Sequence, residues 1–221
     1  SSVVEDRTRR AADVVQEISA HVGGPQTFLG PTLAIPYTVP PQFKTDTTKH
    51  DMYLVFPARA SAMLKTATEE RRRSLFKVPV FQADLKLDGA FDLAGVPAAA
   101  PQGAELDWSR AEIVVGVSDA RGALADAALT VDGKSYTLAP AEVSQNIFVN
   151  GEQNPQCKLT LFGAKVGNSV KPDTQFNVSS VLRFSGAQRI AVLADGKTTH
   201  VNVEGDWPSP GFDGGFLPVN R

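Results

Sequence analysis

The sequence predicts a mainly β protein, an antiparallel β-sandwich preceded by one N-terminal α-helix. Short runs of alternating or β-branched residues recur along the chain with turn residues between them, which is typical of an all-β sandwich. Asp-Gly pairs, which favour tight hairpin turns, follow several of these runs. An apolar period of 3.6 residues is clear only near the N-terminus, so we expect one helix there.

The composition is that of an ordinary globular protein. The chain has 221 residues, 42% of them hydrophobic and 21% charged, with a net charge of -2. No clean boundary divides it, and we therefore treat residues 1–221 as a single domain. The near-neutral charge argues against nucleic acid as the partner, because no basic surplus exists to neutralise phosphates. A single cysteine, Cys157, excludes an internal disulfide and any multi-cysteine metal site.

The predicted helix covers residues 5–22. Apolar residues at 11, 14, 15, 18 and 22 share one face of the helical period, and Gly23-Gly24-Pro25 would end the helix. A second, shorter helix is predicted over residues 59–66, where Ala, Met63 and Leu64 favour the helical state.

The rest of the chain, residues 23–221, is predicted to form the strands of the sandwich. Asp88-Gly89, Asp132-Gly133 and Asp195-Gly196 predict three hairpins. A strand from Val80 to Leu87 follows Pro79, which suggests a strand start or a sheet edge. Residues 38–51 are predicted to form a polar hairpin tip, and residues 95–105 a loop rich in proline and glycine.

The search for catalytic and metal-binding patterns is negative. His21, His50 and His200 lie far apart in the sequence, without the spacing of metal ligands. Neither a nucleophile elbow nor a phosphate-binding glycine loop occurs. We therefore expect no cofactor, no metal and no enzymatic activity.

Two groups of residues are candidates for ligand binding. Asp206 and Asp213 flank Trp207, which resembles an aromatic platform with acidic groups in a sugar site. The alternative is that Trp207 plugs the base of the sandwich and the aspartates cap turns. Asp119 and Arg121 follow the apolar run at 112–117 and are either a ligand-facing pair or an ion pair that stiffens a turn.

The two ends of the sequence suggest a domain cut from a longer protein. The chain begins at Ser1 without an initiator methionine and stops just after an alternating strand at 200–204 and a Pro/Gly segment at 207–218. No run approaches the roughly 18 apolar residues of a membrane span. We expect that membrane segments of the parent protein lie outside this sequence.

Five ordered blocks resemble the CreD family of bacterial inner-membrane proteins. They are residues 7–18, 23–37, 70–81, 108–122 and 207–218, which together extend over nearly the whole chain. Position 81 is Phe where this family is expected to have Tyr.

The resemblance implies a parent protein with one N-terminal span, this domain in the periplasm, and several C-terminal spans. The helix at 1–22 would then lead from the first span. It also implies a role in cell-envelope integrity and stress, with phenotypes such as colicin tolerance, and no catalytic residue comes with it. The partner would be an envelope protein or a cell-wall glycan component. By fold analogy we also expect a likeness to the elongated supersandwich of mutarotase-like proteins, and a carbohydrate-binding or carbohydrate-active domain is the alternative function.

Overall fold

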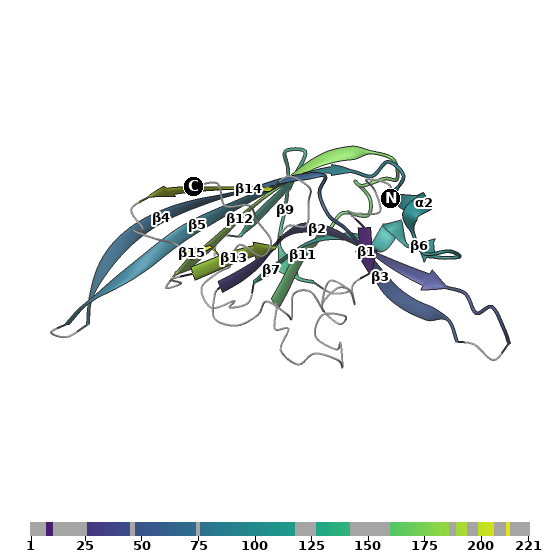
Figure 1. Ribbon diagram of the computed structural model, residues 1–221, viewed down its shortest axis with the longest axis horizontal. Coiled ribbons are helices and arrows are strands. Elements are labelled where there is room, and N and C mark those ends of the chain that lie inside the picture. The colour runs from purple at the N-terminus through teal and green to yellow at the C-terminus, as the bar shows by residue number, and fades with distance from the viewer. Residues whose placement is uncertain are drawn as a thin grey trace.

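Two β-sheets make up most of the chain in the computed structural model (Figure 1). The structure describes residues 8–10, 26–44, 47–73, 76–117, 127–141, 160–185, 189–193, 199–205 and 211–212. In this part of the chain the larger sheet has nine strands and the smaller has six.

The nine-stranded sheet follows the order β1-β3-β2-β7-β11-β10, and β6, β13 and β15 pair beside this path. Its strands are β1 (Thr8–Arg10), β2 (Gln26–Val39), β3 (Lys49–Val55), β6 (Glu105–Leu106), β7 (Glu112–Val117), β10 (Ala139–Pro140), β11 (Thr160–Lys165), β13 (Arg189–Leu193) and β15 (Gly211–Phe212). The short helix α2 (Val96–Ala99) and the 3-10 helix η2 (Trp108–Arg110) lie between β5 (Phe76–Asp92) of the other sheet and β7.

Strand β2 organises the nine-stranded sheet because it is long enough to pair with several strands. It pairs antiparallel with β7 and β3 and, at its first residues, parallel with β13. A bulge separates Leu29 from Thr32 in the pairing with β7. Pro31 is tolerated there because a bulge removes the need for a backbone donor. The Thr32 hydroxyl donates to the Gly30 carbonyl at 3.0 Å within the bulge.

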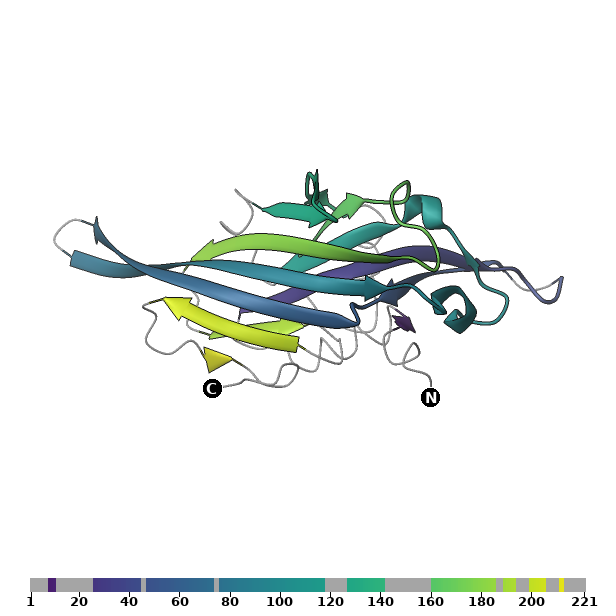
Figure 2. The same cartoon turned by 90° about the horizontal axis from the view of Figure 1, so that it is seen from above.

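The six-stranded sheet follows the order β14-β4-β5-β12-β8-β9. Its strands are β4 (Arg59–Arg73), β5 (Phe76–Asp92), β8 (Ala128–Val131), β9 (Lys134–Tyr136), β12 (Gln175–Ser185) and β14 (Thr199–Gly205). Strands β4 and β5 form one continuous antiparallel pair from Arg59 opposite Ala90 to Arg73 opposite Phe76. This long hairpin gives the molecule its elongated outline (Figure 2).

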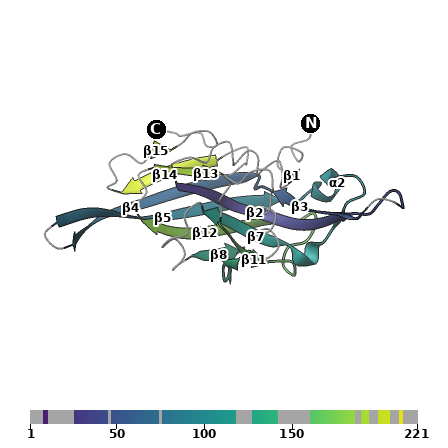
Figure 3. The same ribbon diagram turned by 90° about the horizontal axis from the view of Figure 1, so that it is seen from below.

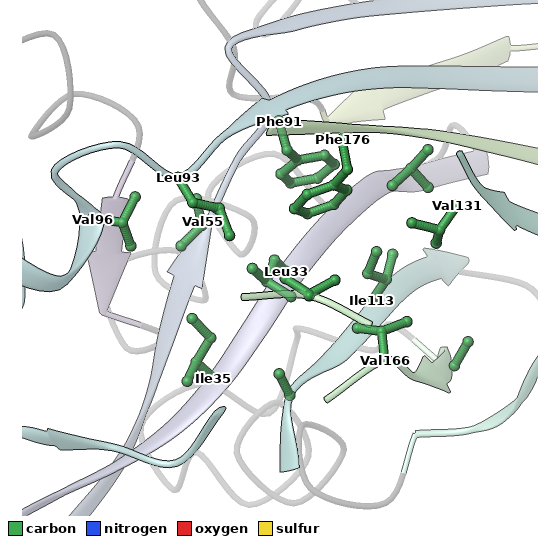
Figure 4. Packing of buried hydrophobic residues seen from close by; sticks show 14 of the residues in the cluster. Leu33, Ile35, Val55, Phe91, Leu93, Val96, Ile113, Val131, Val166 and Phe176 are labelled. Carbon is green, nitrogen blue, oxygen red and sulfur yellow. The ribbon is translucent and has the colours of Figure 1, made fainter. Parts of the chain in front are cut away.

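Apolar side chains of the two sheets meet in a shared core (Figure 4). The nine-stranded sheet contributes Leu33 and Ile113, and the six-stranded sheet contributes Val131. The rings of Phe91 and Phe176 stack with centroids 4.9 Å apart and an interplanar angle of 6°. The predicted mainly β, two-sheet fold is therefore confirmed.

The two sheets differ in what covers their other face. In β7 all six residues are buried, so both faces of this strand are covered. The same holds for residues 52–55 of β3. Among the described side chains of the six-stranded sheet, buried and accessible residues alternate, as in β8, so in this part of the sheet only the core-facing side is covered.

The predicted N-terminal helix over residues 5–22 is wrong at Thr8–Arg10. These residues form β1 and pair antiparallel with β3, from Thr8 opposite Val55 to Arg10 opposite Tyr53. Pairing to a distant strand outweighs the local helical period there. The remainder of the predicted helix lies outside the described residues.

The predicted helix over residues 59–66 is also wrong, because these residues begin strand β4. Ala60 and Ala62 are buried while Arg59 and Lys65 are exposed, which is a period of two. Helix propensity over eight residues is a weak preference, and pairing on both sides with β5 and β14 decides the outcome.

Of the three Asp-Gly hairpins, the one at Asp132-Gly133 is confirmed. It joins β8 to β9 with φ values of 47° and 80°, as a type I′ turn requires. Asp88-Gly89 instead lies inside β5 and makes no turn. A Cβ at Gly89 would lie 3.1 Å from the Pro57 Cβ, so glycine serves close packing at this position. Asp195-Gly196 lies outside the described residues.

Candidate functional site

The uncovered face of the six-stranded sheet carries a row of polar residues. Ser61, Asp88, Ser179 and Thr130 are successive cross-strand partners on β4, β5, β12 and β8. Their neighbours along each strand, such as Ala62, Leu87 and Leu129, are buried in the core. Because side chains alternate between the faces of a strand, the polar row lies on the open face.

This row runs along the floor of a hollow of about 520 Å³, which we call the polar groove. The described residues that line it are Arg59, Ala60, Ser61, Asp88, Gly89, Ala90, Thr130, Asp132, Gly133, Asn177, Val178 and Ser179. A second hollow of about 510 Å³ adjoins it and shares Arg59, Ala90, Asp132 and Asn177. Each volume is in the range of small-ligand sites.

The Asp132 turn fixes one rim of the polar groove. The backbone N–H of Asn177 donates to Asp132 Oδ1 at 2.8 Å, and the Asp132 N–H donates to the Asn177 carbonyl at 2.9 Å. Asp132 has a positive φ of 47°, a conformation that Asp tolerates better than most residues. This reciprocal pair holds the β8–β9 turn against β12.

Packing beneath the sheet holds the floor of the groove in place. The stacked rings of Phe91 and Phe176 lie on the core side of β5 and β12. Pro57 and Phe91 lie so close to Gly89 that a side chain at this position would force one of them to move. The strands that carry the polar row are therefore fixed by core contacts.

The charged groups around the two hollows are mixed. Arg59 is exposed and is the only cation among the described lining residues, and Asp88, Asp92 and Asp132 are the acids. Lys86 lies two residues before Asp88 on the same face of β5, and its Nζ is 3.9 Å from Asp88 Oδ2. The lining thus offers hydroxyl, amide, carboxylate and guanidinium groups, which suit a polar ligand.

No group of three or more His, Cys, Asp or Glu in the described part of the chain could hold a metal ion. Within the same residues, no helix has both the length and the apolar character needed to cross a membrane.

The five residues predicted as ligand-binding candidates, Asp119, Arg121, Asp206, Trp207 and Asp213, all lie outside the described residues. The nearest described residues along the chain are Val117 in β7, Gly205 in β14 and Phe212 in β15. Val117 and Phe212 belong to the nine-stranded sheet, and Gly205 belongs to the six-stranded sheet.

Sequence reasoning missed the polar groove. Ser61 lies in the segment predicted to be helical, and Asp88 lies in one of the predicted turns. The available signal was the alternation of Ser61, Met63 and Lys65 with Ala60 and Ala62, which indicates a half-buried strand. The register that aligns four strands depends on non-local pairing and is absent from any local pattern.

The fold and the groove define a mainly β domain that presents a polar, ligand-sized hollow on the open face of one sheet. The chain belongs to the CreD family, because the family described as "Inner membrane protein CreD" matches residues 1–221. It is 29% identical to the inner membrane protein CreD of Escherichia coli (strain K12) over 226 residues. The match covers 99% of this chain but 47% of the relative, so the chain spans about half the length of that protein. No solved structure matches the chain.

Proposed function

We propose that this chain is a periplasmic module of an inner-membrane CreD protein and contributes to envelope integrity and stress response by binding, without catalysis. The binding site we propose is the polar groove, and its partner is a cell-wall glycan component or an envelope protein. Family membership supports the membrane context, and the open, polar sheet face supports binding.

The observation that carries this proposal is the polar row itself. Neighbouring strands lie about 4.8 Å apart, so Ser61, Asp88, Ser179 and Thr130 present hydrogen-bonding groups at nearly regular intervals. Such an array suits an extended polar ligand that crosses the strands. The floor is held from below, which reduces the ordering cost of binding.

The role in the envelope is tested by removing residues 1–221 from the parent protein while keeping its membrane segments. We expect the envelope phenotype, measured as colicin tolerance, to be lost. Full complementation by the deleted form contradicts the proposal.

The binding site is tested with a panel of peptidoglycan and glucan fragments in a thermal-shift assay. We expect Asp88→Ala to abolish a shift that the unchanged chain shows. Lys86→Ala is the matched control, because it removes the same ion pair and keeps the groove carboxylate. Equal loss in both variants contradicts a site at Asp88.

Partner identity is tested by photo-crosslinking in cells from Thr130 and Asn177, with Lys44 as a position away from the groove. Capture of one protein from the two groove positions and not from Lys44 favours an envelope protein. The alternative of a carbohydrate-binding domain at Asp206, Trp207 and Asp213 predicts that Trp207→Ala, and not Asp88→Ala, abolishes glycan binding.

A further inference from the structure

The charged residues of the polar groove face neutral partners on the neighbouring strands. Strands β4, β5, β12 and β8 lie side by side in this order (Figure 3). The register places Arg59 of β4 opposite Ala90, and it places Asp88 of β5 between Ser61 and Ser179. Neither of these charged residues therefore has an opposite charge directly across from it.

The same face of β5 is arranged differently outside the groove. Asp84 lies opposite Lys65 on one side and Arg183 on the other, and Arg183 Nε is 2.8 Å from Asp84 Oδ1. Opposite charges at directly opposed positions stabilise a pair of strands. The sheet uses that arrangement at Asp84 and departs from it where the groove lies. The charges in the groove are therefore available to a ligand.

Three charged side chains in the groove keep atoms available for binding. No ion pair joins Arg59 to an acid among the described residues. The contact of Asp88 with Lys86 is 3.9 Å long and both side chains are close to half exposed, so it contributes little. Asp132 Oδ1 accepts the Asn177 N–H, and Asp132 Oδ2 makes no hydrogen bond with a described residue.

The positions of these groups set the size and charge of the ligand. Arg59 and the Asp132 turn lie on opposite sides of the groove, with Ala90 and Asn177 between them. Three strand spacings make about 14 Å between the two backbones. An extended peptide of three residues spans about 10 Å, so it fits between the two charged side chains. The acids of the lining outnumber its single cation, which favours a ligand with more ammonium groups than carboxylates.

We infer that the polar groove binds a short peptide with a free carboxylate at Arg59 and ammonium groups at Asp132 and Asp88. This inference rests on the proposed function and names the chemistry of its ligand. A guanidinium binds a carboxylate in a bidentate manner, and an ionised aspartate accepts hydrogen bonds from an ammonium group. The hydroxyls of Ser61 and Ser179 are available to the peptide groups between these ends. Among the proposed partners, peptide-bearing fragments of peptidoglycan fit this chemistry, and neutral glucans do not.

The test measures the binding of three peptides to the 221-residue chain by calorimetric titration. They are Ala-Lys-Ala, the same peptide with both amino groups acetylated, and the same peptide with its carboxylate amidated. We expect Ala-Lys-Ala to bind and each blocked peptide to bind about tenfold more weakly, because each has lost charge-assisted hydrogen bonds. These comparisons change only the ligand, so they do not depend on the folding of a variant.

Two variants connect each blocked group to its partner in the groove. R59Q should bind Ala-Lys-Ala about tenfold more weakly and should leave binding of the amidated peptide unchanged, since that peptide has no carboxylate to lose. D88N should likewise weaken Ala-Lys-Ala and leave the acetylated peptide unchanged. D84N is the matched control, because Asp84 lies on the same face of β5 outside both hollows. Circular dichroism establishes that the three variants fold.

The outcomes separate this inference from the proposed function. Equal binding of the three peptides overturns the inference, and a loss of that binding in Asp88→Ala would still support the polar groove as a binding site. Failure of Ala-Lys-Ala to bind overturns the inference whatever the glucan fragments do. Equal loss in D88N and D84N overturns it as well, because the effect would then not belong to the groove.

Discussion

The two sheets share one core, but among the described side chains β3 and β7 of the nine-stranded sheet are covered on both faces, whereas the six-stranded sheet leaves one face open. In the nine-stranded sheet, residues 52–55 of β3 and all six residues of β7 are buried, and even Thr32 and Glu112 are enclosed. In the six-stranded sheet, the residues that alternate with buried core residues include the polar row of Ser61, Asp88, Thr130 and Ser179. The described part of the nine-stranded sheet is therefore enclosed at β3 and β7, whereas the six-stranded sheet has an accessible face that is free to carry a binding surface.

The largest expected effect comes from shortening a side chain on the enclosed sheet. Leu54→Ala removes a fully buried side chain on β3 and should lower the free energy of unfolding by about 2–5 kcal/mol. Met63→Ala on the outer face of β4 should cost less than about 1 kcal/mol, because Met63 is half-buried. Denaturant unfolding of both variants measures the difference, and equal losses would show that the outer face is covered as well.

An intermediate effect is expected at the floor of the polar groove. Gly89→Ala places a Cβ 3.1 Å from the Pro57 Cβ and 3.3 Å from the Phe91 ring, so a neighbour must move. We expect a loss of about 1–3 kcal/mol in unfolding free energy. Ala90→Ser, one residue along on the open face, is the control and should change stability by less than about 0.5 kcal/mol. An unchanged free energy of unfolding in Gly89→Ala would show that Pro57 and Phe91 can move aside without cost.

The smallest effect is confined to alkaline solution and concerns the inner face of the nine-stranded sheet. Burial raises the pKa of Tyr53 above its usual 10.0, while the Thr8 side chain acts in the opposite direction. The neutral phenol is thus favoured in the folded state. Stability should be unaffected by this group below pH 10 and should fall as the pH rises above 10, where the unfolded chain ionises more readily.

Tyr53→Phe should remove that part of the alkaline decline, which urea unfolding at several pH values would measure. Tyr136→Phe is the control, because Tyr136 is less buried and its hydroxyl donates to the Ser169 hydroxyl at 2.7 Å. The same change in both variants would assign the decline to other groups.

Local patterns predicted the strands whose residues alternate or stay apolar over a whole element. The runs that became β7, the β8–β9 hairpin and β14 are examples. The predictions failed at Thr8–Arg10 and at the start of β4, where pairing with distant strands outweighs a helical pattern. At Asp88-Gly89 the dipeptide signals a turn, but close packing against Pro57 explains the glycine.

The candidate site was harder to predict than the fold, for a physical reason. Ser61, Asp88, Thr130 and Ser179 are far apart in sequence and are ordinary solvent-face residues when each is considered alone. Only the register of four strands places them in one row. The predicted membrane context came from ordered sequence blocks, and the family match agrees with it.

The parallel strands late in the chain also constrain the order in which the protein folds. Strand β13 pairs with the start of β2, and β14 pairs with β4, so each sheet gains a strand from the late segments 189–193 and 199–205. During synthesis, these segments of β2 and β4 cannot form their parallel pairs until strands more than a hundred residues later in the chain have been made. Contacts of such sequence separation form slowly, and unpaired strands attract other chains. The domain therefore depends on protection of two early strands until its last fifth has emerged.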